Sequence, residues 1–426
     1  MIDTIFALSS GSPPAAIAVM RVSGPAAKDA LMALAGRVPP PRSVSLSLLR
    51  GADGAELDRA LVLFLPGPRS PTGEDCAEFH LHGGRAVVAA VEGALGALPG
   101  LRAAQAGEFT RRAFANGRID LAEAEGLADL LAAETELQRR AAQAMAGGAF
   151  SQLAESWRAT LLELSAEVET VLDFADEDDA ISNLSPQFGA RLSALAQDIS
   201  GWLARPHAQV LKEGFRVVLA GPPNAGKSTL FNALVESEAA ITSPVAGTTR
   251  DVILRSVALD GIPFSFVDTA GLREASADAI EQIGIERANQ ELLRADLVLW
   301  LGPEGAGPDG SWEIEAQIDN AGHARKARPA FRLSALSGEG MDALRQAMVE
   351  AARRVMPGPG EAALNARQHA RLSELAEALN EARMQTDSLL VAEGLRRGRL
   401  ALDRLIGRAT TEDMLDALFG RFCIGK

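Results

Sequence analysis

Residues 215–228 carry the sequence FRVVLAGPPNAGKS, in which an apolar, β-branched run leads through glycines into Gly-Lys-Ser. The segment from Gly221 to Ser228 matches the pattern G-x-x-x-x-G-K-[ST], whose backbone N–H groups and following helix N-terminus surround phosphate groups. In such a loop Lys227 contributes a positive charge to the β- and γ-phosphates, and the Ser228 hydroxyl is a ligand for Mg²⁺. The segment therefore predicts a strand, a phosphate-binding loop and a helix within an α/β nucleotide-binding domain.

Three motifs downstream complete the nucleotide-binding pattern. Residues 264–271, FSFVDTAG, predict a strand that ends at Asp268, and we expect Asp268 to hold Mg²⁺ through water and the Gly271 N–H to contact the γ-phosphate. Residues 247–251, GTTRD, lie where a switch threonine must reach Mg²⁺, and residues 334–336, SAL, lie where GTPases place a loop against guanine. Together these motifs resemble the translation-factor-related GTPases of the Era and MnmE kind.

Two positions depart from the pattern of these GTPases. The guanine-reading motif is Asn-Lys-x-Asp, and the nearest candidate is Asn320-Ala-Gly-His323, in which histidine replaces the carboxylate. Because a neutral imidazole cannot accept two protons from guanine as a carboxylate does, we expect weak GTP binding and poor discrimination against other bases. Leu272 stands where Ras-like proteins place a water-orienting glutamine, and no arginine can be assigned to the transition state, so catalysis requires other groups.

Composition limits the class of protein. The 426 residues suffice for two to four domains at about 100–200 residues each, and a hydrophobic content of 47% excludes wholesale disorder. With 42 Lys and Arg against 56 Asp and Glu, the net charge is −14, so binding of nucleic acid would need a local basic patch or a partner. The two cysteines, Cys76 and Cys423, exclude a disulfide scaffold and indicate a reducing compartment. No apolar run reaches the ~18–20 residues of a membrane span, and the start lacks the basic region of a signal peptide, so we expect a cytoplasmic protein without membrane contact.

Patterns of secondary structure predict a multidomain fold of α+β and α/β type. Residues 1–118 mix strand and helix patterns, and residues 213–356 alternate them as in a Ras-like P-loop domain with a mainly parallel sheet. Residues 119–212 and 357–426 repeat apolar residues at helical spacing, and neither segment is large enough for a core of its own. We therefore expect one discontinuous helical domain with the GTPase domain inserted in it.

Six stretches outside the GTPase motifs carry a second resemblance: Asp3–Ile5, Val19–Gly24, Thr72–Asp75, His82–Gly84, Gly107–Glu125 and Phe422–Lys426. They resemble the MnmE (TrmE) family of tRNA-modifying GTPases along nearly the whole chain. The resemblance implies an N-terminal domain that binds tetrahydrofolate and forms a homodimer, and a hetero-oligomer with the flavoprotein MnmG (GidA). It also implies that a K⁺-activated GTPase and this partner add an aminomethyl or carboxymethylaminomethyl group to C5 of the tRNA wobble uridine. The one-carbon donor would be a 5-formyl or methylene derivative of tetrahydrofolate.

The resemblance further implies which residues form the sites. The catalytic candidates are Asn224, which would bind K⁺, and Glu281, which would position the attacking water. The metal ligands would be Ser228 and Thr249 for Mg²⁺ and, besides Asn224, Ser243, Val245 and Thr248 for K⁺. The folate contacts would be Arg21, Glu78, Arg118 and Lys426. The GTP contacts would be Asn224, Ala225, Gly226, Lys227, Ser228, Thr229, Ser243, Pro244, Val245, Ala246, Gly247, Thr248, Thr249, Asp268, Thr269, Ala270, Gly271, Ser334, Ala335 and Leu336.

Several alternatives stay open at this point. The resemblance implies that Cys423 is an exposed thiol near the folate site. The densest basic patch is either a solvated helical face or a contact surface for tRNA or a partner; it comprises Arg396, Arg397, Arg399, Arg404 and Arg408. The chain could also be an RNA- or ribosome-binding switch GTPase without nucleobase chemistry, or a scaffold whose nucleotide site has decayed.

Overall fold

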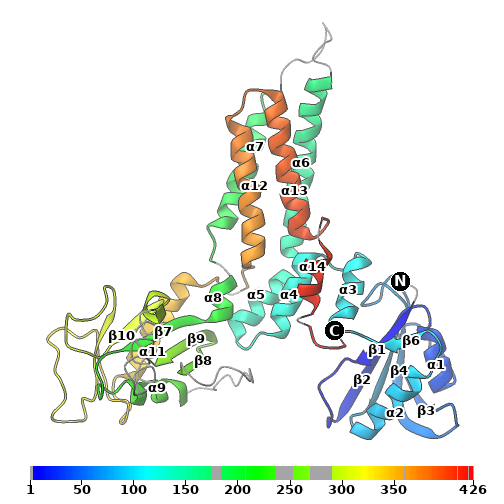
Figure 1. Ribbon diagram of the computed structural model, residues 1–426, viewed down its shortest axis with the longest axis horizontal. Helices are drawn as coiled ribbons and strands as arrows, with labels where there is room; N and C mark the ends of the chain where they lie inside the picture. The colour runs from blue at the N-terminus through cyan, green and yellow to red at the C-terminus, as the bar shows by residue number, and fades with distance from the viewer. Residues whose placement is uncertain are drawn as a thin grey trace, which may run out of the picture. The chain divides into compact units, whose positions relative to one another are not determined.

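The computed structural model describes residues 3–173, 184–206, 208–236, 253–268, 290–358, 360–409, 411–420 and 422–425. The chain forms two compact units, and most of their helices and strands are labelled in Figure 1. Unit 1 combines Met1–Ala128, Ser151–Glu155 and Arg399–Lys426, and unit 2 combines Asp129–Phe150 and Ser156–Gly398. No helix among the described residues is long and apolar enough to cross a membrane.

Unit 1 is built on a six-stranded sheet with the order β3-β4-β5-β2-β1-β6. Its strands are β1 (Thr4–Leu8), β2 (Ile17–Ser23), β3 (Ser45–Arg50), β4 (Glu56–Leu65), β5 (Cys76–His82) and β6 (Leu101–Ala103). All neighbouring pairs are antiparallel except β1 and β6, which are parallel. The helices of this unit are α1 (Ala27–Ala35), α2 (Arg85–Gly96), α3 (Glu108–Ala115) and α14 (Glu412–Phe419).

One face of this sheet is covered by α1 and α2, and the other carries the polar residues discussed below. Alternate residues of a strand point to opposite faces, so β2 and β5 send Met20 and Phe79 into the core with Leu31 of α1 and Val91 of α2. On the opposite face, the antiparallel register aligns one row across four strands: Leu46, Leu61, His80 and Val19.

Ile424 and Gly425 contact the segments that follow β6 and β1. Ile424 forms an isolated antiparallel bridge with Ala106, and the Ser9 hydroxyl donates a 2.7 Å hydrogen bond to the Gly425 carbonyl. A Cβ at Gly425 would lie 2.0 Å from the Leu8 carbonyl oxygen, and the residue has φ +96°. Glycine is therefore required at this position by both the close approach and the backbone conformation.

Unit 2 contains a second six-stranded sheet with the order β12-β11-β10-β7-β9-β8. Its strands are β7 (Phe215–Ala220), β8 (Ile253–Leu259), β9 (Ile262–Asp268), β10 (Leu297–Trp300), β11 (Trp312–Glu315) and β12 (Phe331–Arg332). Only the β8–β9 pair is antiparallel, which confirms the mainly parallel sheet expected from the sequence. The α/β helices of this unit are α9 (Lys227–Glu236) and α11 (Met341–Val355).

Further helices of unit 2 come from the two segments that flank the α/β region. They are α5 (Glu136–Ala146), α7 (Phe188–Leu203), α8 (Ala208–Glu213) and α12 (Ala366–Met384), while α4 (Leu121–Leu131), α6 (Ala149–Asp173) and α13 (Ser388–Ile406) contribute residues to both units. Capping boxes at Thr135 and Asn365 start α5 and α12. Leu137 of α5 and Leu211 of α8 share one hydrophobic core with the parallel sheet, so these flanking helices are packed on the α/β region.

Candidate nucleotide site

The loop between β7 and α9 has the backbone of a phosphate-binding loop. Gly221 and Gly226 have φ values of +150° and +89°, and Asn224 is a non-glycine residue with φ +63°. An asparagine tolerates this left-handed conformation better than most residues. A Cβ at Gly221 would lie 3.0 Å from the Gly302 nitrogen, so the neighbouring strand end also requires glycine here.

Lys227 is folded over this loop. Its Nζ donates hydrogen bonds to the carbonyl oxygens of Gly221 (3.0 Å) and Pro222 (2.8 Å), and the residue is 6% exposed. A buried ammonium group at a helix N-terminus is a concentrated positive charge beside several backbone N–H groups. The arrangement is suited to anionic oxygens.

Ser228 and Asp268 form the candidate Mg²⁺ position. The Ser228 hydroxyl donates a 2.8 Å hydrogen bond to Asp268 Oδ2, and Asp268 ends the fully buried strand β9 with 2% exposure. A hydroxyl and a carboxylate oxygen are hard ligands of the type that Mg²⁺ prefers, so these residues fit the ion. The structure thus brings together two residues that the sequence predicted for the same metal.

A cavity of about 260 Å³ lies beside the loop and has the lining expected for a nucleotide base. Its walls come from α9, from the segment after β11 and from the segment after β12; the lining residues are Gly226, Thr229, Leu230, Ala316, Gln317, Asp319, Asn320, Leu333, Ala335 and Leu336. Leucine side chains offer apolar surface for a flat ring, and Asp319 offers a carboxylate to donors at its edge. We call this space the base cavity.

The base cavity corrects the position of the base-reading motif. His323, which stood in place of the reading carboxylate in the sequence analysis, is not among the lining residues, whereas Asp319 is. Strand β11 ends at Glu315, so the loop that follows it starts at Ala316 and reaches Asp319 at its fourth residue. The expectation of poor guanine discrimination therefore loses its basis. Counting from the strand end, rather than searching for an initial asparagine, would have found this carboxylate.

Gln317 occupies the second position of the same loop and contacts the phosphate-binding loop. Its Nε2 donates a 3.2 Å hydrogen bond to the Asn224 carbonyl oxygen, and a Cβ at Gly226 would lie 3.0 Å from the same nitrogen. Gln317 has φ +60°. A glutamine amide thus packs over the loop where the GTPase motif has lysine, a contact that the sequence analysis missed.

The three residues of the Ser334–Leu336 segment lie in different environments. Ala335 and Leu336 line the base cavity, and Leu336 is 79% exposed. Ser334 is fully buried, and its hydroxyl accepts a hydrogen bond from the Ser337 N–H at 3.1 Å. Ser334 therefore shapes the turn that presents its two neighbours.

Several predicted residues lie outside the described part of the chain. They are Ser243, Pro244, Val245, Ala246, Gly247, Thr248, Thr249, Thr269, Ala270, Gly271, Leu272, Glu281 and Lys426. Their assignments stay predictions.

On the face of the first sheet opposite α1 and α2, the structure pairs two of the predicted folate residues. Arg21 Nε and Nη2 each lie 2.9 Å from Glu78 Oε1, and His80 Nε2 lies 3.1 Å from Glu78 Oε2. The guanidinium carbon of Arg21 is 5.9 Å from the centre of the Phe109 ring. Arg118 is exposed beyond the end of α3, against the loop at Gly73.

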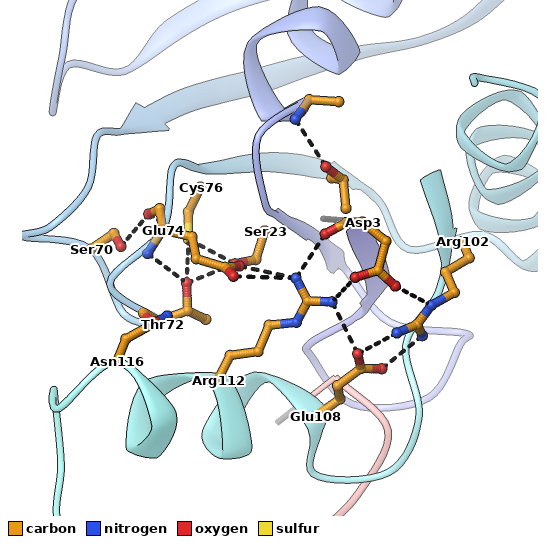
Figure 2. Close-up of polar contacts among 12 residues, drawn as sticks. Asp3, Ser23, Ser70, Thr72, Glu74, Cys76, Arg102, Glu108, Arg112 and Asn116 are labelled. Carbon is orange, nitrogen blue, oxygen red and sulfur yellow. Dashed lines mark hydrogen bonds and ion pairs between the residues drawn. The ribbon is translucent and has the colours of Figure 1, made fainter. Parts of the chain in front are cut away.

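Arg112 is the centre of a buried polar network in unit 1 (Figure 2). Its guanidinium is fully buried and forms ion pairs with Asp3 (3.0 Å), Glu74 (3.1 Å) and Glu108 (3.1 Å). Burial by itself would raise the pKa of Glu108, but hydrogen bonds from Arg102 and Arg112 lower it below its usual range. The network joins the start of β1, the loop before β5 and helix α3, and so fixes the elements around Arg21.

The cysteines and the basic patch can also be placed. Cys423 is exposed, as expected, and Cys76 is buried. The described residues hold no group of three or more side chains that could bind a metal ion. Three arginines of the basic patch are paired with glutamates: Arg396 with Glu393, Arg397 with Glu381 and Arg408 with Glu155. For these three, the pairing favours a solvated, charge-balanced helix surface.

Comparison with known proteins gives matches over the whole chain. The family model described as the MnmE helical domain matches residues 121–423, and the model described as the GTP-binding protein TrmE N-terminus matches residues 4–118. A tRNA modification GTPase MnmE of Novosphingobium aromaticivorans is 63% identical over 437 residues, and one of Erythrobacter litoralis is 62% identical over 424 residues. Each alignment covers 100% of both chains.

Solved structures match over a smaller part. The G domain of the T. maritima FeoB iron transporter is 26% identical, with a TM-score of 0.24, and the match covers 32% of this chain and 98% of that one.

Proposed function

The chain belongs to the MnmE (TrmE) family of tRNA modification GTPases, and we propose that it hydrolyses GTP to drive modification of the tRNA wobble uridine. In this proposal the enzyme is K⁺-activated and acts with the flavoprotein MnmG. It adds an aminomethyl or carboxymethylaminomethyl group to C5 of the uridine, with the carbon supplied by a tetrahydrofolate derivative. Residues 1–118 bind the folate, residues 213–356 bind GTP, and residues 119–212 and 357–426 form the helical domain.

The nucleotide site is the observation that carries the proposal. The Gly221–Ser228 loop holds the phosphates through its N–H groups and Lys227, and Asp319 accepts the two ring-edge protons of guanine in the base cavity. When bound, Mg²⁺ and K⁺ supply positive charge to the phosphates. Ser228 and Asp268 would hold Mg²⁺, and Asn224 would contact K⁺. Glu281 would orient the water that attacks the γ-phosphate.

The folate site is supported by charge and position. Glu78, oriented by Arg21 and His80, is a carboxylate suited to pterin N–H donors, and Arg21 and Arg118 are cations suited to the glutamate tail of folate. The Ser9 hydroxyl donates to the carbonyl of Gly425, the residue before Lys426, and the Ser9 N–H donates to the carbonyl of Val19 in β2. Strand β2 also carries Arg21, so Gly425 is held beside the strand of a proposed folate residue. Arg21, Glu78 and Arg118 therefore fit a tetrahydrofolate derivative.

The homodimer proposal is supported by apolar surface on the first sheet. Leu46, Leu48 and Leu61 are 55%, 36% and 43% exposed on the face that α1 and α2 leave uncovered. Neighbouring exposed leucines on a sheet face favour a protein interface.

The test is complementation of a strain that lacks this protein, with wobble nucleosides measured by mass spectrometry. We expect the modified nucleoside to disappear, to return with the wild-type chain, and to stay absent with Lys227→Ala or Arg21→Ala. Arg354→Ala, at an exposed position of α11, is the matched control and should restore it. Unchanged nucleosides in the deletion strain would instead indicate a switch GTPase without nucleobase chemistry.

A further inference from the structure

The segment after the base cavity carries a histidine that the proposed chemistry does not use. His323 lies between β11 and β12, and its side chain is 9% exposed. Its Nδ1 is 2.8 Å from the Asn320 carbonyl oxygen, and its Nε2 is 2.9 Å from Glu315 Oε1. The imidazole thus connects a residue that lines the base cavity to the end of strand β11.

Both partners of this ring accept hydrogen bonds and cannot donate them. A backbone carbonyl has no proton to give, and neither does an ionised carboxylate. A neutral imidazole carries one N–H group, so it can satisfy only one of the two contacts. Both contacts are hydrogen bonds only when the ring is protonated on both nitrogens.

The connected segment is the one that presents Asp319. The Asn320 N–H donates to the Gln317 carbonyl at 2.8 Å, and the His323 N–H donates to the Asn320 carbonyl at 3.0 Å. Asp319 and Asn320 therefore lie within two consecutive tight turns, and the contact between the His323 ring and Glu315 holds the last residue of these turns against strand β11. Without that contact, the turns that contain Asp319 would be attached to the sheet at one end only.

We propose that His323 is held as an imidazolium and acts as a positioning residue for base recognition, so that guanine-nucleotide affinity falls when the ring loses its proton. The inference rests on the proposed function, because it requires that the base cavity binds guanine. His323 acts through Asn320 and the neighbouring Asp319, and it does not touch the nucleotide.

Charged groups around the imidazole ring determine the pH range over which His323 loses its proton. Glu315 is 5% exposed and also accepts hydrogen bonds from Arg332 Nε (3.1 Å) and the Lys326 N–H (3.3 Å), so it stays ionised. The hydrogen bond to Glu315 and that to Asn320 raise the pKa of His323, while burial and the charge of Arg325 oppose this. The Lys326 ammonium group is itself paired with Glu313 at 2.5 Å. Since the pKa is raised, the contact is complete below the ordinary histidine value of about 6.5 and is lost as pH rises through the raised value.

The test is the affinity for GDP between pH 6 and 9, measured by calorimetry on the full chain for wild type, His323→Gln and His323→Ala. We expect wild-type affinity to fall by about fivefold across this range, the factor that one typical hydrogen bond carries. The two variants should show no such fall, and His323→Ala should bind about fivefold more weakly than wild type at pH 6. His82→Gln, at an exposed histidine paired with Asp58 in unit 1, is the control and should keep the wild-type profile.

Two further measurements keep the outcomes distinct. Inorganic triphosphate, which has no base, should show the same pH dependence in wild type and His323→Gln. NMR of the histidine ring nitrogens should show that His323 loses its proton only above the ordinary histidine value of about 6.5, a result that does not depend on any variant folding. Superimposed GDP profiles of wild type and His323→Gln, or a ring that loses its proton at or below that value, would overturn the inference alone. Failure of the wild-type chain to bind GDP at any pH would overturn the proposed function as well.

Discussion

Asp319→Asn is the change that most directly tests the base cavity. In the proposed site the Asp319 carboxylate accepts the N1 and N2 protons of guanine in two charge-assisted hydrogen bonds, each worth about 1.5–3 kcal/mol. Asparagine keeps one acceptor and places an amide donor at the other position. Asp319 is exposed, so solvent reduces the gain, and the lower part of the range applies, about 2 kcal/mol or about thirtyfold in GDP affinity.

The same variant should gain affinity for xanthosine diphosphate. Xanthine has a carbonyl where guanine has its amino group, so the asparagine amide can donate to it. The assay is a competition titration of GDP, IDP, XDP and ADP against a fluorescent nucleotide, with wild type and Asp319→Asn side by side. Wild type should prefer GDP strongly, and the ratio of GDP to XDP affinity should fall by at least about a hundredfold in the variant. Equal GDP affinity in the two proteins would show that another residue reads the base, and the assignment of Asp319 would be wrong.

The remaining predictions concern catalysis and stability. GTP hydrolysis should be faster in K⁺ than in Na⁺, and Asn224→Ala should remove the difference in steady-state rates; equal wild-type rates in both salts would exclude the K⁺ proposal. Glu281→Ala should lower kcat and leave nucleotide affinity nearly unchanged, because a water-orienting group acts in the transition state; a parallel loss of affinity would indicate a structural role. Arg112→Met should lower the free energy of unfolding by about 3 kcal/mol in urea titrations, because Glu74 loses its cation at a largely buried position while Glu108 and Asp3 keep only Arg102. Arg111→Met, whose partners Glu412 and Asp416 are exposed, is the control and should cost less than about 1 kcal/mol.

The nucleotide loop and the sheet around it could be predicted from the sequence alone. The loop depends on the backbone of consecutive residues, from Gly221 to Ser228, and its glycines are visible without any tertiary contact. The strand before Gly221 and the strand that ends at Asp268 are mostly apolar, with Arg216 and Ser265 as the interior polar residues, as is typical of buried parallel strands. Local backbone geometry and local hydrophobicity therefore sufficed for the phosphate site and for the α/β class.

Only the tertiary structure shows that Asp319 lines the base cavity and which side chains contact Arg21 and Arg112. Asp319 faces the base cavity because β11 ends at Glu315 and pairs with β10 and β12, a register set by contacts along the whole sheet. Arg21 meets Glu78 because β2 pairs with β5 in a register where a shift of one residue would move both side chains to the other face. Arg112 is buried because two segments distant in sequence, at Asp3 and at Glu74, supply carboxylates and a backbone oxygen in addition to Glu108 of its own helix. Residue types at fixed spacing specify local motifs, whereas strand register and packing between distant segments determine which side chains meet.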